Sequence, residues 1–294
     1  VLQTRRWLPG GPSVYLPVDT GDLPVGDYRL DIVIETRDHW MEIGRDSWAL
    51  RVVPKGALKS RTAYIDEHNR LMYEGKPFFP LGMYFSGINE DDLKLYADSA
   101  LNCLMPYGAP DKARMDLAQS LGLKIIYSIK DIYYGSAYCP KDIKTQDDER
   151  RFIEAKARDY RDHPALLAWY LNDELSLEYM DRLETHQQWM QELDPNHPTW
   201  IVLYQVGQLT HYRKTFDAIG TDPYPIPSSP ASRAADYTRT TVESVKGARP
   251  VWQVPQVFNW ATYRKTEEDK AGCRPPTLAE MRSMAWQCIT EGAK

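Results

Sequence analysis

Short apolar segments alternate with longer amphipathic segments along most of this 294-residue chain, and this alternation constrains the fold more than any other feature. The apolar segments predict strands at Phe79–Phe85, Asn102–Pro106, Lys124–Ile129, Leu166–Leu171, Thr199–Tyr204, Ala218–Asp222 and Pro250–Gln256. The segments that follow them predict helices at residues 89–99, 111–121, 148–160, 176–193, 208–214, 232–246 and 277–290. Repeated β/α units of this kind indicate a parallel sheet with right-handed crossovers.

Seven β/α units that approach an eighth predict an α/β fold, a (β/α)8 TIM barrel over residues 79–294. The eighth strand would begin at about Glu291–Lys294, so we expect it to lie beyond the end of this sequence. A doubly wound open sheet is the alternative architecture. It is disfavoured because no Gly-x-Gly-x-x-Gly turn follows the first strand.

The first 55 residues have a different pattern, with alternating segments separated by glycine and proline. They predict strands at Ser13–Val18, Asp27–Glu35 and Ser47–Val53. Three strands are too few for a complete sandwich, so we interpret residues 1–55 as the C-terminal part of an Ig-like β-sandwich. Residues 56–78 then predict a linker and a short hairpin.

Composition and charge exclude several classes of partner. The net charge is −5 and no basic cluster is present, which argues against nucleic acid and anionic membranes as partners. No apolar run has the length of a membrane span. The four cysteines and six histidines show no metal-binding spacing, and no phosphate-binding loop is present, so we expect no metal and no cofactor.

The stretch Ala165–Glu174 is an apolar run that ends abruptly in Asn172, Asp173 and Glu174. As a strand it alternates, so we expect Leu167, Trp169 and Leu171 to face a layer of helices and the other side chains to face the opposite way. A carboxylate at the end of an apolar strand is costly unless it is paired or used. We therefore interpret Glu174 as functional. For Asp173 an equally good interpretation is that it stabilises the start of the next helix.

Polar and aromatic residues follow every predicted strand. Because the C-terminal ends of barrel strands meet at one mouth, these residues predict a single site there. The composition is rich in aromatic residues that suit stacking on sugars, with 19 Tyr and 9 Trp against 6 Phe. Carboxylates, amides and aromatic rings together favour a neutral polyhydroxylated ligand and acid catalysis at a glycosidic bond. The residues at the strand ends are Tyr84, Tyr107, Lys130, Asp131, Asn172, Asp173, Glu174, Tyr204, Gln205, Asp222, Tyr224, Gln256 and Trp260.

Residues 75–294 resemble the clan A glycoside hydrolases, and the upstream strands resemble the sandwich that often precedes such barrels. The matching stretches are G-K-P-F-F-P-L-G-M-Y at Gly75–Tyr84, W-Y-L-N-D-E-L at Trp169–Leu175, L-D-P-N-H-P at Leu193–Pro198, D-A-I-G-T-D-P-Y-P at Asp217–Pro225 and P-V-W-Q-V-P-Q at Pro250–Gln256. The resemblance implies that Glu174 is the general acid/base, with Asp173 in place of the asparagine that usually precedes it. It also implies that Tyr224 is the strand-six aromatic residue near the nucleophile.

The chain departs from this family at the end of the seventh strand, where Gln256 stands in place of the nucleophilic glutamate. A carboxamide cannot form the glycosyl-enzyme ester at a useful rate. Three explanations stay open: an engineered nucleophile variant, the use of another carboxylate such as Asp222 or Asp131, or sugar binding without cleavage. We rank a glycoside hydrolase first, a non-hydrolytic carbohydrate-binding barrel second and a structural scaffold third.

The sequence thus defines a set of candidate residues and partners. The catalytic candidates are Glu174, Asp173, Asp222 and Gln256. Tyr84, Glu174, Asp222, Tyr224 and Gln256 are expected to line one pocket. An oligo- or polysaccharide and further domains of the same polypeptide are the expected partners, and the family resemblance alone favours a secreted or periplasmic location. The substrate-binding candidates are Tyr84, Tyr107, Asp131, Asn172, Tyr204, Tyr224 and Trp260.

Overall fold

The computed structural model describes residues 20–21, 23–36, 38–85 and 89–294, which fall into two compact units. The first unit ends at Leu58 and the second runs from Lys59 to Lys294. None of the helices in the described parts of the chain combines the length and apolarity that a bilayer crossing needs.

The described part of the first unit is an antiparallel hairpin of β1 (Gly26–Glu35) and β2 (Glu42–Val52). Apolar and polar residues alternate along β1, as expected for a strand with one face against other protein. The predicted strand Ser47–Val53 is the second half of β2. The predicted strand Ser13–Val18 lies outside the described residues, and the sandwich interpretation stays a prediction.

A short turn, η1 (Ala57–Ser60), spans the boundary between the units, and the second unit continues with a small antiparallel sheet. Its strands are β3 (Ala63–Ile65), β4 (Leu71–Tyr73) and β5 (Lys76–Pro77). Ala63, Leu71 and Tyr73 pack in one cluster with residues of the main sheet. The Tyr73 hydroxyl also donates to the carbonyl oxygen of Pro164, just before a main-sheet strand begins. The small sheet therefore covers the N-terminal ends of the main strands, away from the ends that carry the site.

The main sheet has six parallel strands in chain order, and its pairing confirms the predicted β/α alternation. Each strand lies beside the strand that precedes it in the sequence, which is the arrangement of a barrel rather than of a doubly wound sheet. The strands are β6 (Gly82–Phe85), β7 (Cys103–Pro106), β8 (Lys124–Ser128), β9 (Leu166–Asp173), β10 (Thr199–Leu203) and β11 (Ala218–Thr221).

Within the described residues the sheet is an open half-barrel, and the closed eight-stranded barrel stays a prediction. The predicted seventh strand, Pro250–Gln256, makes only a single parallel bridge between Val251 and Ile219. Its backbone N–H groups at Trp252 and Val254 donate to β11, at 2.8 and 3.0 Å. Proline at positions 250 and 255 removes two N–H donors, which limits the ladder to this short contact.

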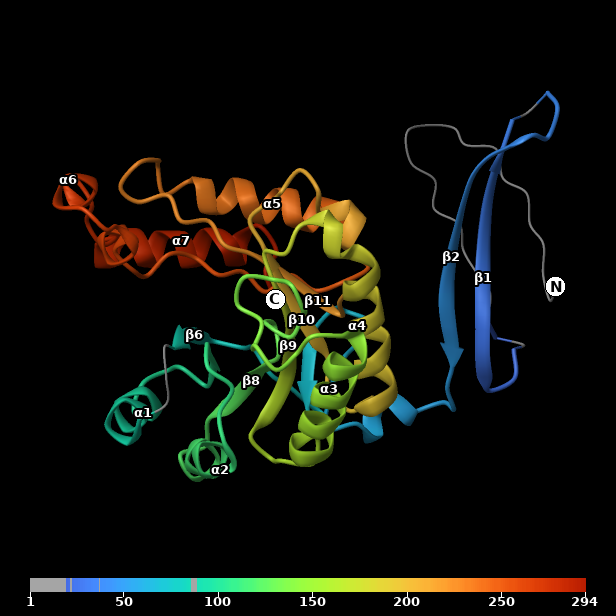
Figure 1. Ribbon diagram of the computed structural model, residues 1–294, viewed down its shortest axis with the longest axis horizontal. Coiled ribbons are helices and arrows are strands. Elements are labelled where there is room, and N and C mark those ends of the chain that lie inside the picture. The colour runs from blue at the N-terminus through green and yellow to red at the C-terminus, as the bar shows by residue number, and fades with distance from the viewer. Residues whose placement is uncertain (1–19, 22, 37, 86–88) are drawn as a thin grey trace. The chain divides into compact units, whose positions relative to one another are not determined.

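The helices lie around the outer side of the sheet (Figure 1). Side chains of Asn89, Asp111, Thr145 and Thr277 cap α1, α2, α3 and α7 by accepting a backbone hydrogen bond. The α-helices are α1 (Glu90–Ala97), α2 (Lys112–Ser120), α3 (Gln146–Tyr160), α4 (Met180–Leu193), α5 (Arg233–Val245), α6 (Glu267–Lys270) and α7 (Leu278–Thr290). The further 3-10 turns are η2 (Leu177–Tyr179), η3 (Leu209–Tyr212) and η4 (Trp260–Tyr263).

The central strand β9 corrects one expectation about which side chains face the helices. Trp169 and Leu171 pack in the cluster that includes helix residues, as expected, but Leu167 packs with Ala168 and Tyr170 in the other cluster. The pairing of β8 with β9 is irregular here, because Ile125 pairs with Leu166 whereas Ile126 pairs with Ala168. A bulge of this kind interrupts the strict alternation of side chains.

Candidate active site

The chain turns sharply where β9 ends, and this turn presents Glu174. Glu174 has a φ of +62°, in the left-handed region that glutamate rarely adopts. Its N–H donates to the carbonyl oxygen of Val202 at 2.9 Å, and the buried Asn172 side chain accepts from the N–H of Leu175 at 2.9 Å. A strained residue held by neighbouring bonds is a recurring feature of functional sites.

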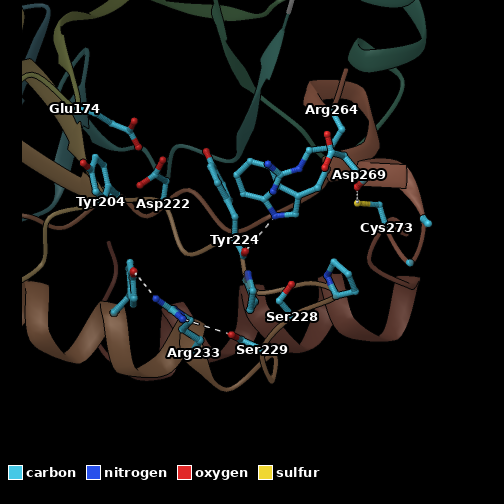
Figure 2. A pocket seen from close by; sticks show the side chains of 16 residues that line it. Glu174, Tyr204, Asp222, Tyr224, Ser228, Ser229, Arg233, Arg264, Asp269 and Cys273 are labelled. Atoms are coloured by element: carbon cyan, nitrogen blue, oxygen red, sulfur yellow. Dashed lines mark hydrogen bonds between the residues drawn. The ribbon is translucent and has the colours of Figure 1, made fainter. Parts of the chain in front are cut away.

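The carboxyl of Glu174 is within hydrogen-bond reach of the carboxyl of Asp222, which follows β11 (Figure 2). Asp222 is only 7% exposed, and its Oδ1 is buried without a hydrogen-bond partner among the described residues. Two ionised carboxylates cannot share such a contact, whereas one shared proton satisfies both groups. We infer from this contact that the two carboxyls act as a pair that holds one proton.

Burial and charge raise the pKa of both members of this pair. Burial and the neighbouring charge of Glu174 raise the pKa of Asp222 far above its usual range. For Glu174, burial is the largest cause of a raised pKa, and the charge of Asp173 adds to it, while the hydrogen bond with Asp222 and the charge of Lys130 oppose it. Glu174 remains exposed to the pocket, so it is the member that a ligand meets first.

Asp173 is held by a buried cation. The side chain of Lys130 is 6% exposed and forms ion pairs with Asp131 at 3.0 Å and Asp173 at 3.2 Å. Its ammonium lies 5.0 Å from the centre of the Tyr107 ring. Burial opposes the charge of Lys130, but the attraction of Asp173 and Asp131 raises its pKa above the ordinary value. The Lys130 ion pair gives Asp173 a structural partner besides the start of the next helix, and the helix-stabilising interpretation stays a prediction.

Two tyrosines extend this network into the half-barrel. The Tyr170 hydroxyl donates to Oδ1 of Asp173 at 2.7 Å, and the hydroxyls of Tyr84 and Tyr170 are 3.1 Å apart. The ring of Tyr84 also contacts Tyr107 edge-on, with centroids 5.4 Å apart. Tyr84, Tyr107, Asp131 and Asp173 thus support the site from one side.

Gln256 does not face the site. Its side chain is fully buried, and its hydrogen bonds go to backbone groups in the loop after β11 and in its own loop. Oε1 accepts from the N–H of Ile226 at 2.8 Å, and Nε2 donates to the carbonyl oxygens of Ile226 at 2.9 Å and Phe258 at 3.0 Å. In these contacts the amide oxygen accepts and the amide NH2 donates, so glutamine can make all of them. An ionised glutamate has no N–H to donate to the two carbonyl oxygens.

A pocket of about 850 Å³ opens beside the carboxyl pair (Figure 2). One wall consists of residues at the ends of β9, β10 and β11, and the other consists of the start of α5 and the segment 260–273. The pocket is lined by Glu174, Tyr204, Asp222, Tyr224, Pro225, Pro227, Ser228, Ser229, Arg233, Tyr237, Trp260, Arg264, Asp269, Ala271, Gly272 and Cys273.

The structure thus brings together part of the predicted set. Glu174, Tyr204, Asp222, Tyr224 and Trp260 line the pocket, whereas Tyr84, Tyr107, Asp131, Asn172, Asp173 and Gln256 are not among its lining residues. The expectation that Tyr84 and Gln256 line this pocket with the others is wrong, because Tyr84 packs in the inner cluster and Gln256 is bonded to a loop. No group of three His, Cys, Asp or Glu side chains suited to a metal occurs in the described parts of the chain.

Sequence reasoning missed the residues of the opposite wall, above all Arg233, Tyr237 and Arg264. One sequence signal could have indicated this wall. It is the Ser-Ser-Pro segment that follows Pro225–Pro227 and leads directly into α5. Lys130 was recognised as a strand-end residue but not as the cation of a buried network.

Comparisons with known proteins show the fold. No protein-family model and no curated protein sequence matches the chain. Among solved structures it is similar to a β-glucuronidase from Bacteroides uniformis, with a TM-score of 0.57 and 12% identity over 90% of this chain and 34% of that one. It is similar to a β-glucuronidase from an uncultured Clostridium sp., with a TM-score of 0.55 and 13% identity over 90% and 53% of the two chains. A glycoside hydrolase family 5 mannosidase from Rhizomucor miehei gives a TM-score of 0.58 and 10% identity over 79% and 82%.

These similarities establish a glycoside hydrolase fold. The chain spans about a third to a half of the length of the two β-glucuronidases that it matches.

Proposed function

We propose that this chain is a glycoside hydrolase whose acid/base group is Glu174 and whose second carboxyl is Asp222. The carboxyl pair that holds one proton at the edge of a pocket carries this proposal. The position of the pair agrees with it, because active sites of (β/α)8 barrels lie at the C-terminal ends of the strands. The glycoside hydrolase fold of the chain is consistent with the same chemistry.

In this proposal Glu174 donates its proton to the glycosidic oxygen as the bond to the anomeric carbon breaks. Burial raises the pKa of both carboxyls, and most strongly that of Asp222, so the proton that Glu174 donates is the one that Asp222 passes to it within the pair. Asp222 then stabilises the positive charge that develops on the sugar and receives a proton from the attacking water. Tyr204, Tyr224 and Trp260 line the same pocket and offer flat surfaces for sugar rings.

The contact between the two carboxyls sets a condition on this mechanism. Carboxyls in contact leave less room between them than the roughly 5–5.5 Å of retaining pairs or the 6.5–9.5 Å of inverting pairs. A substrate must therefore separate Glu174 from Asp222 when it enters.

The same contact favours a second candidate, a barrel that binds carbohydrate without cleaving it. Gln256 supplies no carboxylate at the seventh strand position, and it is bonded to backbone instead of facing the pocket. A protein of this kind keeps the aromatic pocket and lacks a pair at either catalytic spacing.

A panel of glycans and aryl glycosides, assayed for cleavage and for binding by calorimetry, distinguishes the two. If the protein is a hydrolase, Glu174→Gln should lower turnover of substrates with poor leaving groups roughly 10²–10⁴-fold and affect activated aryl glycosides much less. Glu178→Gln, an exposed change in η2, is the matched control. Equal loss on both substrate types would contradict the role of Glu174. Binding without cleavage would favour the second candidate, and neither binding nor cleavage would contradict both.

A further inference from the structure

The wall of the pocket at the start of α5 holds a guanidinium that no acidic side chain neutralises. Arg233 lines the pocket and is exposed, and in the described part of the chain no carboxylate lies within ion-pair distance of it. Neutral hydroxyls hold it instead. Its Nη2 donates to the Tyr237 hydroxyl at 3.0 Å and its Nη1 lies 3.4 Å from Oγ of Ser229 (Figure 2).

The contrast with another arginine of the same helix makes this arrangement informative. Arg239, which is not among the pocket-lining residues, pairs with Asp236 at 3.2 Å and with Glu291 at 2.7 Å. Arg239 thus has acidic partners on α5 and at the end of α7, whereas the pocket-lining Arg233 has none among the described residues.

The contacts of Arg233 orient the guanidinium without consuming its charge. Hydrogen bonds to Tyr237 and Ser229 use two of its five N–H donors and add no negative charge. The guanidinium also lies 5.1 Å from the centre of the Tyr237 ring, which supports its flat face. A planar donor fork that is held in place and still charged suits a bidentate contact with a carboxylate.

A second cation on the pocket wall points the same way. Arg264 also lines the pocket, and its guanidinium lies 5.6 Å from the centre of the Trp260 ring. Trp260 is one of the aromatic surfaces on which a sugar ring can stack, so this positive charge lies beside the sugar-binding surface. Arg264 lacks the hydroxyl contacts that orient Arg233 in the described residues, and we therefore assign the specific contact to Arg233.

We propose that the pocket recognises an acidic sugar and that Arg233 binds its anionic substituent, the carboxylate of a uronic acid. This inference rests on the proposed carbohydrate pocket and adds the chemical class of its ligand. A sulfate ester presents a similar anion, and the matched ligands below distinguish it from a carboxylate.

Matched ligands test the inference directly. Calorimetry would compare oligogalacturonides, oligomannuronates and glucuronoxylan fragments with their carboxyl-reduced forms, in which each uronic acid has become the neutral hexose. We expect the acidic form of at least one ligand to bind roughly 10- to 100-fold more tightly, as charge-assisted hydrogen bonds imply. Arg233→Met should abolish this preference. Arg233→Lys should keep part of it, and Arg239→Met should keep all of it.

The outcomes separate this inference from the proposed function. Equal or tighter binding of the carboxyl-reduced forms would overturn the acidic-sugar inference and leave the carbohydrate pocket intact. An unchanged preference in Arg233→Met would overturn the assignment to Arg233. A sulfated galactan fragment that binds more tightly than both its desulfated form and every uronic acid ligand would overturn the choice of carboxylate. Failure of every acidic and neutral glycan to bind would overturn the inference together with the carbohydrate pocket.

Discussion

Asp173 and Glu174 are adjacent in the sequence, yet their carboxyls belong to different electrostatic settings. Asp173 is paired with Lys130 at 3.2 Å and accepts the Tyr170 hydroxyl at 2.7 Å, so its charge is compensated. Glu174 instead faces the buried carboxyl of Asp222, and burial raises the pKa of both groups.

The pairing of Asp222 predicts a pH-dependent stability. A carboxyl whose pKa rises on folding holds its proton more tightly in the folded state, so stability falls as pH rises above the unfolded pKa of about 3.9. Asp222→Asn cannot ionise and escapes this penalty. We expect the variant to exceed the parent protein by at least about 1 kcal/mol at pH 8 and to match it near pH 4, as measured by urea unfolding. Asp236→Asn, on the exposed side of α5, is the control, and a parent protein more stable at pH 8 than the variant would contradict the shared proton.

The network around Lys130 predicts a strong coupling energy. Lys130→Met leaves Asp131 and Asp173 without their cation and should destabilise the fold by roughly 2–4 kcal/mol. Adding Asp173→Asn removes one of the uncompensated charges, so the double variant should recover part of this loss. A double-mutant cycle by urea unfolding measures the coupling. Additive losses would mean that the Lys130–Asp173 ion pair contributes nothing.

The bonding of Gln256 predicts the outcome of restoring a carboxylate at the seventh strand position. Gln256→Glu would place a buried carboxyl oxygen against the carbonyl oxygens of Ile226 and Phe258. We expect a loss of roughly 2–4 kcal/mol in unfolding free energy and no gain of glycosidase activity. Gln191→Glu, an exposed change on α4, should be nearly neutral. New hydrolytic activity in the buried variant would show that Gln256 replaces a lost nucleophile after all.

The position of Trp260 on the pocket wall predicts a specific loss of ligand binding on its removal. Trp260 packs edge-on against Phe258 and Tyr224, with ring centroids 5.1 and 6.1 Å apart, and lines the pocket. Trp260→Ala should weaken carbohydrate binding roughly 10- to 30-fold, as for a buried aromatic anchor. Trp286→Ala, on the exposed face of α7, removes an equal side chain outside the pocket. Equal affinities of the two variants in calorimetry would exclude Trp260 from the binding surface.

The fold was largely predictable because the buried main strands have a recognisable apolar pattern in the sequence. Strands such as Leu166–Leu171 are continuous apolar runs, and α1, α2, α3 and α7 begin at residues with capping side chains. The exceptions are local. Proline at positions 250 and 255 restricts the last predicted strand to one bridge. Strand β6 begins at Gly82 rather than Phe79, because the N–H of Leu81 donates to the Asn102 side chain instead of to a neighbouring strand.

The site was predictable only as a set of strand ends. Glu174 and Asp222 both end parallel strands, which places them at one mouth, but contact between their carboxyls depends on the backbone turn at Glu174. The direction of the Gln256 side chain depends on the shape of the loop near Ile226, which no local pattern reports. Arg233 belongs to a helix, so a search of strand ends alone could not find it.

The two walls of the pocket differ in how they are supported, and this difference has an evolutionary consequence. Glu174 and Asp222 follow β9 and β11 of the main sheet, where a substitution disturbs the packed sheet. Trp260, Arg264 and Asp269 stand on a connecting segment with only short helical turns, η4 and α6. Mutations can therefore diversify ligand choice on that segment while the chemistry at Glu174 and Asp222 is inherited unchanged.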